Sequence, residues 1–457
     1  MKKTVVINVV GLSQRLIGEY TPFISQFLAN GKAAVIEPVL PAVTCSAQST
    51  YLTGKLPTEH GIVGNGWYFK DEYEVKFWRQ SNALVQAPKI WDDLKGIDPK
   101  FTCANMFWWY NMYSNADYSV TPRPNYLADG RKIPDIYSNP ASLRDELQGQ
   151  LGTFPLFHFW GPKTSIKSTK WIVDATIETD KKYNPTLTLV YLPHLDYNMQ
   201  RYGLNFEIIK NDLKEIDSEV AKLVTYYEAQ QANVILLSEY GITDVSNPIH
   251  LNRHLRKANL LGVRVERGLE LLDAGASEAF AVADHQIAHV YVKNKEKLPL
   301  VASILKEING VERVIPKSEL DNVGLAHDRA GDFVLVANGT SWFTYYFWED
   351  DEKAPDYARM VDIHKKPGYD PVEMLTNPSD KLIMAKVAWK LAKKKLGFRS
   401  VLDIIPLKAE LIKGSHGRKP EDKADWPIFI SNANHLNVQS EISATAVYDQ
   451  LKNHILL

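Results

Sequence analysis

Cysteine is scarce in this sequence, with only Cys45 and Cys103 among 457 residues. Two cysteines cannot build a disulfide framework, and no Cys/His spacing has the pattern of a zinc finger. A reducing compartment is the simpler interpretation of so few cysteines. We therefore expect a cytoplasmic protein.

Long apolar runs are also missing. No window approaches the roughly 18 apolar residues that a membrane-spanning helix needs. The apolar stretch over residues 4–12 is short, contains Asn8 and is followed by no small-residue cleavage site. These features predict a buried first strand rather than a signal peptide, and they predict no membrane span.

An excess of charge of one sign is absent as well, because 53 lysines and arginines nearly cancel 54 aspartates and glutamates. We therefore expect no nucleic acid polymer as a partner, although a local basic pocket is compatible with this balance. Hydrophobic residues make up 45% of the chain, which excludes wholesale disorder. The length fits about three domain-sized units or one large α/β enzyme. We predict a single domain over residues 1–457.

Short apolar runs alternate with amphipathic stretches. The runs suit strands that are buried on both faces, and the alternation predicts a mainly parallel sheet flanked by helices. The predicted strands are Thr4–Val10, Ala33–Val39, Thr186–Leu192, Asn233–Leu237, His289–Val292 and Phe333–Ala337. The predicted helices include Thr21–Asn30, Asn211–Gln231, Leu298–Ile308 and Lys381–Leu396. Ligands of such a sheet bind beyond the carboxyl ends of its strands.

The stretch from about residue 65 to 170 has a different composition, rich in aromatics, proline and glycine. We interpret it as an insertion or lid over the strand ends. Its centre is the aromatic run Phe107–Tyr113.

One region carries a recognisable motif. Residues 41–54 read PAVTCSAQSTYLTG, and residues 56–65 read LPTEHGIVGN. This pattern resembles the nucleophile region of the type I phosphodiesterase/nucleotide pyrophosphatase branch of the alkaline phosphatase superfamily. The resemblance implies an alkaline-phosphatase-like α/β fold, with Thr44 as the nucleophile and Asn65 as the donor to a phosphate oxygen. Without the motif, Thr44 would be interpreted only as a helix cap.

The resemblance also implies two zinc ions on either side of the threonine. Asp196 and His416 match two ligands of one ion, but the expected histidine of that set is Gln200. For the second ion, an aspartate falls on Val10, and an Asp-His pair falls on Glu239-Tyr240. Three ligand positions are therefore lost or replaced by poor ligands.

The remaining set, which is Thr44, Asp196, Gln200, Glu239 and His416, is mostly oxygen. Oxygen-rich sites favour magnesium, manganese or calcium, whereas the family resemblance implies zinc. Two histidines could rebuild the site. His285 is the first, because on a strand it would share one face with His289, and Asp284 could orient one of these histidines. His364 is the second, and it lies in a charged segment. Ordinary surface or strand-end roles are the alternatives for both.

Aromatic residues of the predicted lid are candidates for substrate binding. Family members place aromatics here that sandwich a nucleobase or another leaving group, which makes Trp108, Trp109 and Tyr110 candidates. A role in the core is the alternative, since large aromatics bury well. Arg123, between two prolines, is a candidate phosphate clamp.

These observations predict a phosphoester hydrolase that acts on a diester or pyrophosphate of a small phosphorylated molecule. Thr44 would attack phosphorus with help from a divalent metal. A phosphonate hydrolase is one alternative. A second is a catalytically inactive descendant that binds a phosphorylated metabolite or a partner.

Overall fold

The computed structural model describes the whole chain except residues 129–130, 379, 397 and 399–401. Its largest feature is a nine-stranded sheet in the order β23-β2-β22-β11-β1-β10-β5-β6-β9. The strands of this sheet are β1 (Thr4–Val9), β2 (Lys32–Glu37), β5 (Cys103–Met106), β6 (Tyr118–Pro122), β9 (Ile136–Asn139), β10 (Leu187–Leu192), β11 (Asn233–Leu237), β22 (Ile428–Ser431) and β23 (Glu441–Ser443). Only β22 and β9 run against the others. The predicted mainly parallel α/β sheet is thus confirmed.

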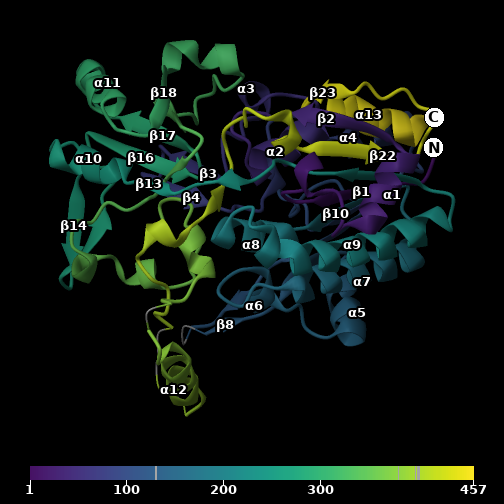
Figure 1. Cartoon of the computed structure of the whole chain (residues 1–457), viewed down its shortest axis with the longest axis horizontal. Coiled ribbons are helices and arrows are strands. Elements are labelled where there is room, and N and C mark those ends of the chain that lie inside the picture. The colour runs from purple at the N-terminus through teal and green to yellow at the C-terminus, as the bar shows by residue number, and fades with distance from the viewer. Residues whose placement is uncertain (129–130, 379, 397, 399–401) are drawn as a thin grey trace.

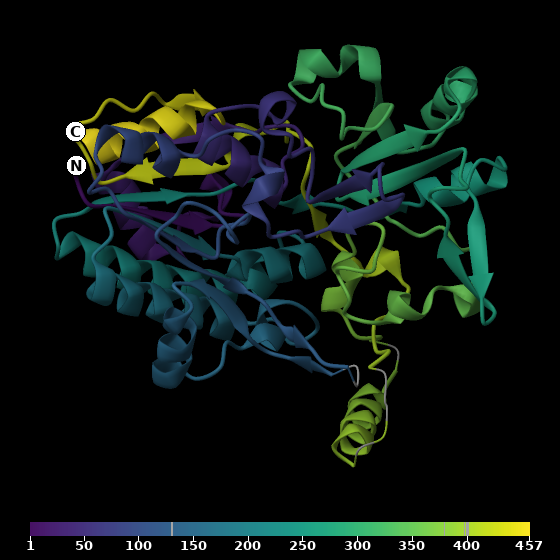
Figure 2. The same cartoon turned by 180° about the vertical axis from the view of Figure 1, so that it is seen from behind.

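Helices cover both faces of this sheet (Figures 1 and 2). One face carries α1 (Pro22–Asn30), α7 (Ile166–Tyr183), α8 (His194–Tyr202) and α9 (Phe206–Glu228), and the other carries α2 (Thr44–Thr53), α4 (Ile90–Ile97) and α13 (Ala446–Leu456). The central strands β1, β10 and β11 are buried along their whole length. Burial on both faces explains why their sequences are continuous apolar runs.

A second, antiparallel sheet lies beside the first and has the order β16-β17-β19-β18. It consists of β16 (Ala279–Asp284), β17 (Ile287–Val292), β18 (Val311–Pro316) and β19 (Phe333–Ala337), with α10 (Leu251–Lys257) and α11 (Leu298–Lys306) packed against it. The runs at residues 289–292 and 333–337 are strands, as predicted, but they belong to this sheet. An apolar run indicates burial and does not identify the neighbouring strand.

The interpretation of residues 65–170 as an insertion or lid is wrong. This segment supplies β5, β6 and β9 to the central sheet, as well as the helices α5 (Ser142–Leu151) and α6 (Leu156–Phe159). Its aromatic composition reflects packing beside the sheet, since Phe107, Phe154 and Trp171 contact one another there.

Smaller elements complete the structure. They are α3 (Pro57–His60), α12 (Ile383–Lys395), and the strand pairs β3 (Gly66–Phe69) with β4 (Glu74–Phe77), β7 (Asn125–Tyr126) with β8 (Lys132–Ile133), β12 (Thr243–Asp244) with β21 (Gly414–Ser415), β13 (Asn247–Ile249) with β20 (Ser341–Phe343), and β14 (Val263–Glu266) with β15 (Leu269–Leu272). The helix α12 projects from the body in both views. In the described part of the chain, no helix has the length and apolar character needed to cross a membrane.

The central strands should dominate stability. We predict that Leu236→Ala in β11 lowers the free energy of unfolding by about 2–5 kcal/mol, because Leu236 is fully buried and the truncation leaves a cavity. Ile97→Ala is the matched control, since Ile97 is 55% exposed, and it should change stability by about 0.5 kcal/mol or less. Denaturant titration of both variants tests this, and equal losses would contradict it.

Candidate active site

The candidate catalytic residues lie at the edge where β1, β10 and β11 end. Thr44 is the first residue of α2, Asp196 lies in the first turn of α8, and Glu239 follows the end of β11. All three side chains are buried. Because the strands are parallel, their carboxyl ends bring these distant segments to one place.

Thr44 does not act as a helix cap. Val43 occupies the position before α2, and no side chain caps this helix. The Thr44 Oγ1 atom instead lies 3.3 Å from the hydroxyl of Tyr240. Its hydroxyl thus points toward the end of β11, where a reacting group is expected.

The Glu239 carboxyl group interacts with this hydroxyl. Burial raises its pKa to about 8, while hydrogen bonds from Gln48, Asn8 and Thr44 oppose the shift. The amides of Asn8 and Gln48 both donate to Glu239 Oε1. Glu239 Oε2 and Asn8 Oδ1 are buried with no hydrogen-bond partner. Two oxygen acceptors at this site are therefore unsatisfied.

Asp196 and Gln200 take part in a closed circuit of contacts. Gln200 Nε2 donates to Asp196 Oδ2 at 2.7 Å, and the Tyr240 hydroxyl donates to Asp196 Oδ1 at 3.2 Å. The Tyr369 hydroxyl donates to Gln200 Oε1 at 3.0 Å. Gln200 and Tyr240 stand at two of the substituted ligand positions, and here they act as hydrogen-bonding groups.

Four stacked rings connect the two tyrosines. The ring centroids are 3.5 Å apart between Tyr240 and His416, 3.6 Å between His416 and His285, and 3.7 Å between His285 and Tyr369. We call these four residues the ring stack. With Asp196 and Gln200 they form a loop of direct contacts behind Thr44.

Both histidines of the ring stack are neutral. Burial lowers the pKa of His416 to about 3, and burial together with His416 lowers the pKa of His285 well below its usual range. His416 Nδ1 donates to the Ala42 carbonyl at 2.8 Å, so Nε2 carries the lone pair. His285 lies in contact with His416, and a metal-binding role for it stays a prediction.

Asn65 is held from two sides. Its Oδ1 accepts a hydrogen bond from the backbone N–H of Cys45 at 3.0 Å, and its Nδ2 and backbone N–H both donate to Asp284, at 3.0 and 2.7 Å. The Asn65 side chain therefore lies at the start of α2, beside Thr44. Its amide must release Asp284 before it can donate to a ligand.

Three buried carboxyl groups lie in the candidate active site, Asp196 and Glu239 at this sheet edge and Asp284 at the end of β16. Burial raises the pKa of Asp196 to about 6 and that of Asp284 to about 7, as it does for Glu239. In the described structure, no lysine or arginine is among the main influences on the pKa of any of the three. Either protons or a bound cation must balance this charge.

The family's pair of zinc ions does not fit these residues. Val10, Gln200 and Tyr240 replace three ligands, and no three His, Asp or Glu atoms of this site lie within 4.8 Å of one another among the described residues. One hard cation fits better, because magnesium or manganese needs only one or two protein carboxylates. The unsatisfied Glu239 Oε2 and Asn8 Oδ1 are suitable oxygen donors.

The predicted aromatic residues separate into two groups. The backbone N–H of Trp109 donates to Gln48 of α2, and Tyr110 interacts with Cys45, so both lie against the nucleophile helix. Trp108 is fully buried in the core of the central sheet, which assigns it a structural role.

Three other predicted contributors lie elsewhere. Arg123 is exposed beyond β6 and affects the pKa of Tyr126 rather than any site carboxyl, so the structure gives no support for a phosphate clamp. His364 contacts the Phe77 carbonyl and is not recruited to the site. His289 bonds to Val63 and does not share a strand face with His285, because His285 lies in the turn before β17.

Sequence reasoning missed the roles of Gln48, Tyr369 and Asp284. Gln48 lies one turn after Thr44 on α2, so helical spacing could have indicated that both side chains face one way. Tyr369 comes from a loop distant in sequence, and only the fold brings it to Gln200. Asp284 orients Asn65 rather than a histidine.

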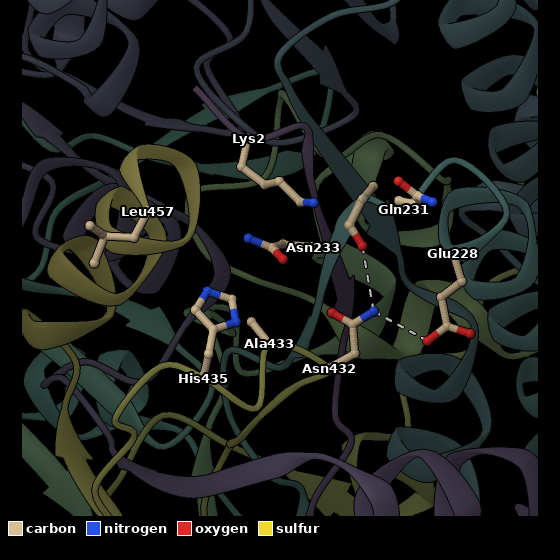
Figure 3. A pocket seen from close by; sticks show the side chains of 9 residues that line it. Lys2, Glu228, Gln231, Asn233, Asn432, Ala433, His435 and Leu457 are labelled. Atoms are coloured by element: carbon tan, nitrogen blue, oxygen red, sulfur yellow. Dashed lines mark hydrogen bonds between the residues drawn. The ribbon is translucent and has the colours of Figure 1, made fainter.

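A separate pocket lies at the opposite edge of the sheet (Figure 3). It is lined by residues just before β1, at the start of β11 and after β22, including Lys2, Asn233 and Asn432. Asn432 Nδ2 donates to Glu228 there at 3.2 Å. Thr44 is not among its lining residues, so this pocket is distinct from the candidate active site.

The comparison with protein families now gives the class of protein. Residues 4–370 match the model of the type I phosphodiesterase/nucleotide pyrophosphatase family, and the chain belongs to that family. The matched range includes Thr44, Asn65, Asp196 and Glu239 and ends before His416.

Two curated relatives come from yeasts. An uncharacterized pyrophosphatase/phosphodiesterase of Schizosaccharomyces pombe is 22% identical over 215 residues, which cover 46% of this chain and 38% of the relative. Ectonucleotide pyrophosphatase/phosphodiesterase 2 of Saccharomyces cerevisiae is 24% identical over 264 residues, which cover 53% of this chain and 48% of the relative. The match thus spans less than half the length of each relative.

Solved structures share the fold over nearly the whole chain. Murine ectonucleotide pyrophosphatase/phosphodiesterase 5, as an inactive variant in complex with AMP, superposes with a TM-score of 0.61 at 16% identity and covers 100% of this chain and 96% of its own. Phosphonoacetate hydrolase from Sinorhizobium meliloti, in complex with phosphonoformate, gives 0.61 at 14% identity, with 99% and 96% covered. These likenesses confirm the predicted fold class.

Asp284 should make stability depend on pH. An unfolded aspartate loses its proton near pH 4, whereas folded Asp284 keeps it to about pH 7. The folded state binds more protons in this window, so the stability due to this group is lost as pH rises from about 4 to about 7.

We predict that Asp284→Asn makes this decline shallower, because the amide does not titrate. Urea unfolding between pH 4 and 8 in buffer with a chelator measures it. Asp71→Asn is the control, since Asp71 is an exposed aspartate. Identical slopes for both variants would contradict the assignment.

Proposed function

We propose that this protein hydrolyses a phosphodiester or pyrophosphate bond, with Thr44 Oγ1 as the nucleophile and Glu239 as the base. The observation that carries the proposal is the position of Thr44 at the start of α2, with its hydroxyl beside Glu239 and Tyr240. Membership of the phosphodiesterase family supports it. The start of a helix also favours a phosphate group, because backbone N–H groups point toward it.

The proton of Thr44 passes to Glu239 as the nucleophile attacks. The Oγ1–P bond forms while the bond from phosphorus to the leaving oxygen breaks in line, and the leaving oxygen, on the far side of phosphorus, takes a proton from solvent water. Water then attacks phosphorus from that far side and loses its proton to solvent, while the bond from phosphorus to Thr44 Oγ1 breaks and Glu239 returns its proton to Oγ1. Burial raises the pKa of Glu239 to about 8 in the metal-free protein, and a cation bound at this site would lower it, so that the carboxylate can accept the proton near neutral pH.

A hard divalent cation held by Glu239 and Asn8 would neutralise charge on the transferring phosphoryl group. Such a cation would also balance the negative charge of the three buried carboxyl groups. We propose magnesium or manganese rather than zinc, because the available donors are oxygens and the substituted positions remove nitrogen ligands.

The substrate is proposed to be a small molecule with a nucleotide-like leaving group. A related structure contains AMP, and another contains a phosphonate. Trp109 and Tyr110 lie against α2 and could contact a base or an aryl group. Phosphonate cleavage at the same threonine is the second hydrolytic reaction to test.

We also propose a reducing, cytoplasmic setting, since Cys45 and Cys103 are both unpaired.

Binding without turnover is the alternative function, and one observation favours it. The Asn65 amide is already engaged by Cys45 and Asp284, so the expected donor to a phosphate oxygen is not free. A pseudoenzyme would bind AMP or a phosphonate and release it unchanged. Calorimetric binding together with a product assay on the same sample separates the two functions.

We predict that Thr44→Ala lowers kcat/KM for bis(4-nitrophenyl) phosphate on the order of 10³-fold or more, because the nucleophile is lost. Thr53→Ala at the other end of α2 is the matched control and should retain activity. Release of nitrophenolate measures both rates. If Thr44→Ala hydrolyses the ester as fast as the parent, Thr44 is not the nucleophile.

We further predict that manganese or magnesium restores activity to chelator-treated protein more fully than zinc does. Glu239→Gln should abolish this restoration, because the variant lacks both the base and the anionic oxygen donor. Activity assays with each metal measure the order of preference. The highest activity with zinc would contradict the hard-cation assignment.

A further inference from the structure

A cluster outside the candidate active site combines one histidine with two carboxylates. His194 is the first residue of α8, and Asp212 and Glu215 lie three residues apart on one face of α9. His194 Nε2 is 3.3 Å from Asp212 Oδ1 and 3.2 Å from Glu215 Oε2. We call these three residues the α8–α9 cluster.

The contacts in the α8–α9 cluster are not ordinary hydrogen bonds. The His194 side chain is 2% exposed, and neither of its ring nitrogens makes a hydrogen bond of normal geometry. A buried imidazole without hydrogen bonds is costly unless another partner satisfies it. The ring nevertheless directs Nε2 into the space between two carboxylate oxygens.

The spacing of the three atoms matches a coordination shell. Metal–ligand bonds of about 2.0–2.2 Å in a tetrahedron place neighbouring ligand atoms about 3.3–3.6 Å apart. The separations of His194 Nε2 from Asp212 Oδ1 and from Glu215 Oε2, 3.3 and 3.2 Å, lie at and just below the short end of this range. Asn198 Nδ2 donates to both oxygens of Asp212, at 2.9 and 3.0 Å, and so fixes that carboxylate from behind.

We propose that the α8–α9 cluster binds one divalent transition-metal ion of the zinc type. One imidazole and two carboxylates supply three ligands, and water completes the shell on the side of Glu215, whose side chain is 46% exposed. None of the three residues stands at a position where the family resemblance implies a ligand. The site is therefore additional to the candidate active site and independent of the proposed function.

The ion would have a structural role. It would tie the start of α8 to α9, and α8 carries Asp196 and Gln200 of the candidate active site. Only the neutral imidazole of His194 can bind a metal ion, so affinity for the metal should rise with pH.

The test titrates zinc or cobalt into the full-length, chelator-treated protein, with calorimetry and the visible absorption of tetrahedral cobalt as readouts. Glu215→Gln and His194→Gln should each weaken binding at least about tenfold. Glu207→Gln, on the exposed side of the same helix, is the matched control and should bind like the parent. Thermal unfolding should shift upward with zinc in the parent and the control only.

Several outcomes would overturn the proposal. A parent protein that binds no zinc would show that the α8–α9 cluster is only an ion pair. Equal affinities of Glu215→Gln and Glu207→Gln would do the same, and Glu215→Gln keeps this test valid if His194→Gln fails to fold. Glu239→Gln separates the two sites, because it should retain cobalt binding here even if the proposed hydrolytic function is wrong.

Discussion

The burial of Asp196, Glu239 and Asp284 in the candidate active site is the constraint on which this site depends. Parallel strands of the central sheet place Asp196 and Glu239, whereas Asp284 comes from the end of β16 in the second sheet, and no lysine or arginine of the described residues is among the main influences on their pKa values. When no cation is bound, this burial raises the pKa of all three carboxyl groups. Both the proposed base and the proposed cation follow from this same imbalance of charge.

The two residues that replace metal ligands at positions 200 and 240 both contact the same aspartate, Asp196. Gln200 and Tyr240 fill the positions of the lost ligands, since the side chain of each donates a hydrogen bond to Asp196. Tyr240 also stacks on His416 and so connects Asp196 to the ring stack. A circuit of satisfied contacts holds Asp196 in place without a zinc ion. This arrangement explains how the chain keeps the family's architecture after losing half of its expected metal ligands.

Much of the fold was predictable, but the neighbours of each element were not. The strand Asn233–Leu237 is confirmed to the residue, because an apolar run bounded by polar residues defines a buried strand. Phe333–Ala337 is equally well bounded yet joins the second sheet. In the site, the motif located Thr44 and Asn65, whereas Tyr369 and Asp284 could not be found, because their contacts exist only after folding.

The central claim is that Thr44 becomes covalently bonded to phosphorus. Acid quenching during turnover of bis(4-nitrophenyl) phosphate in the presence of manganese, followed by peptide mass spectrometry, tests this most directly. The account predicts an aryl phosphate ester on the peptide that contains Thr44. Turnover with no adduct, or with an adduct on another residue, would contradict it.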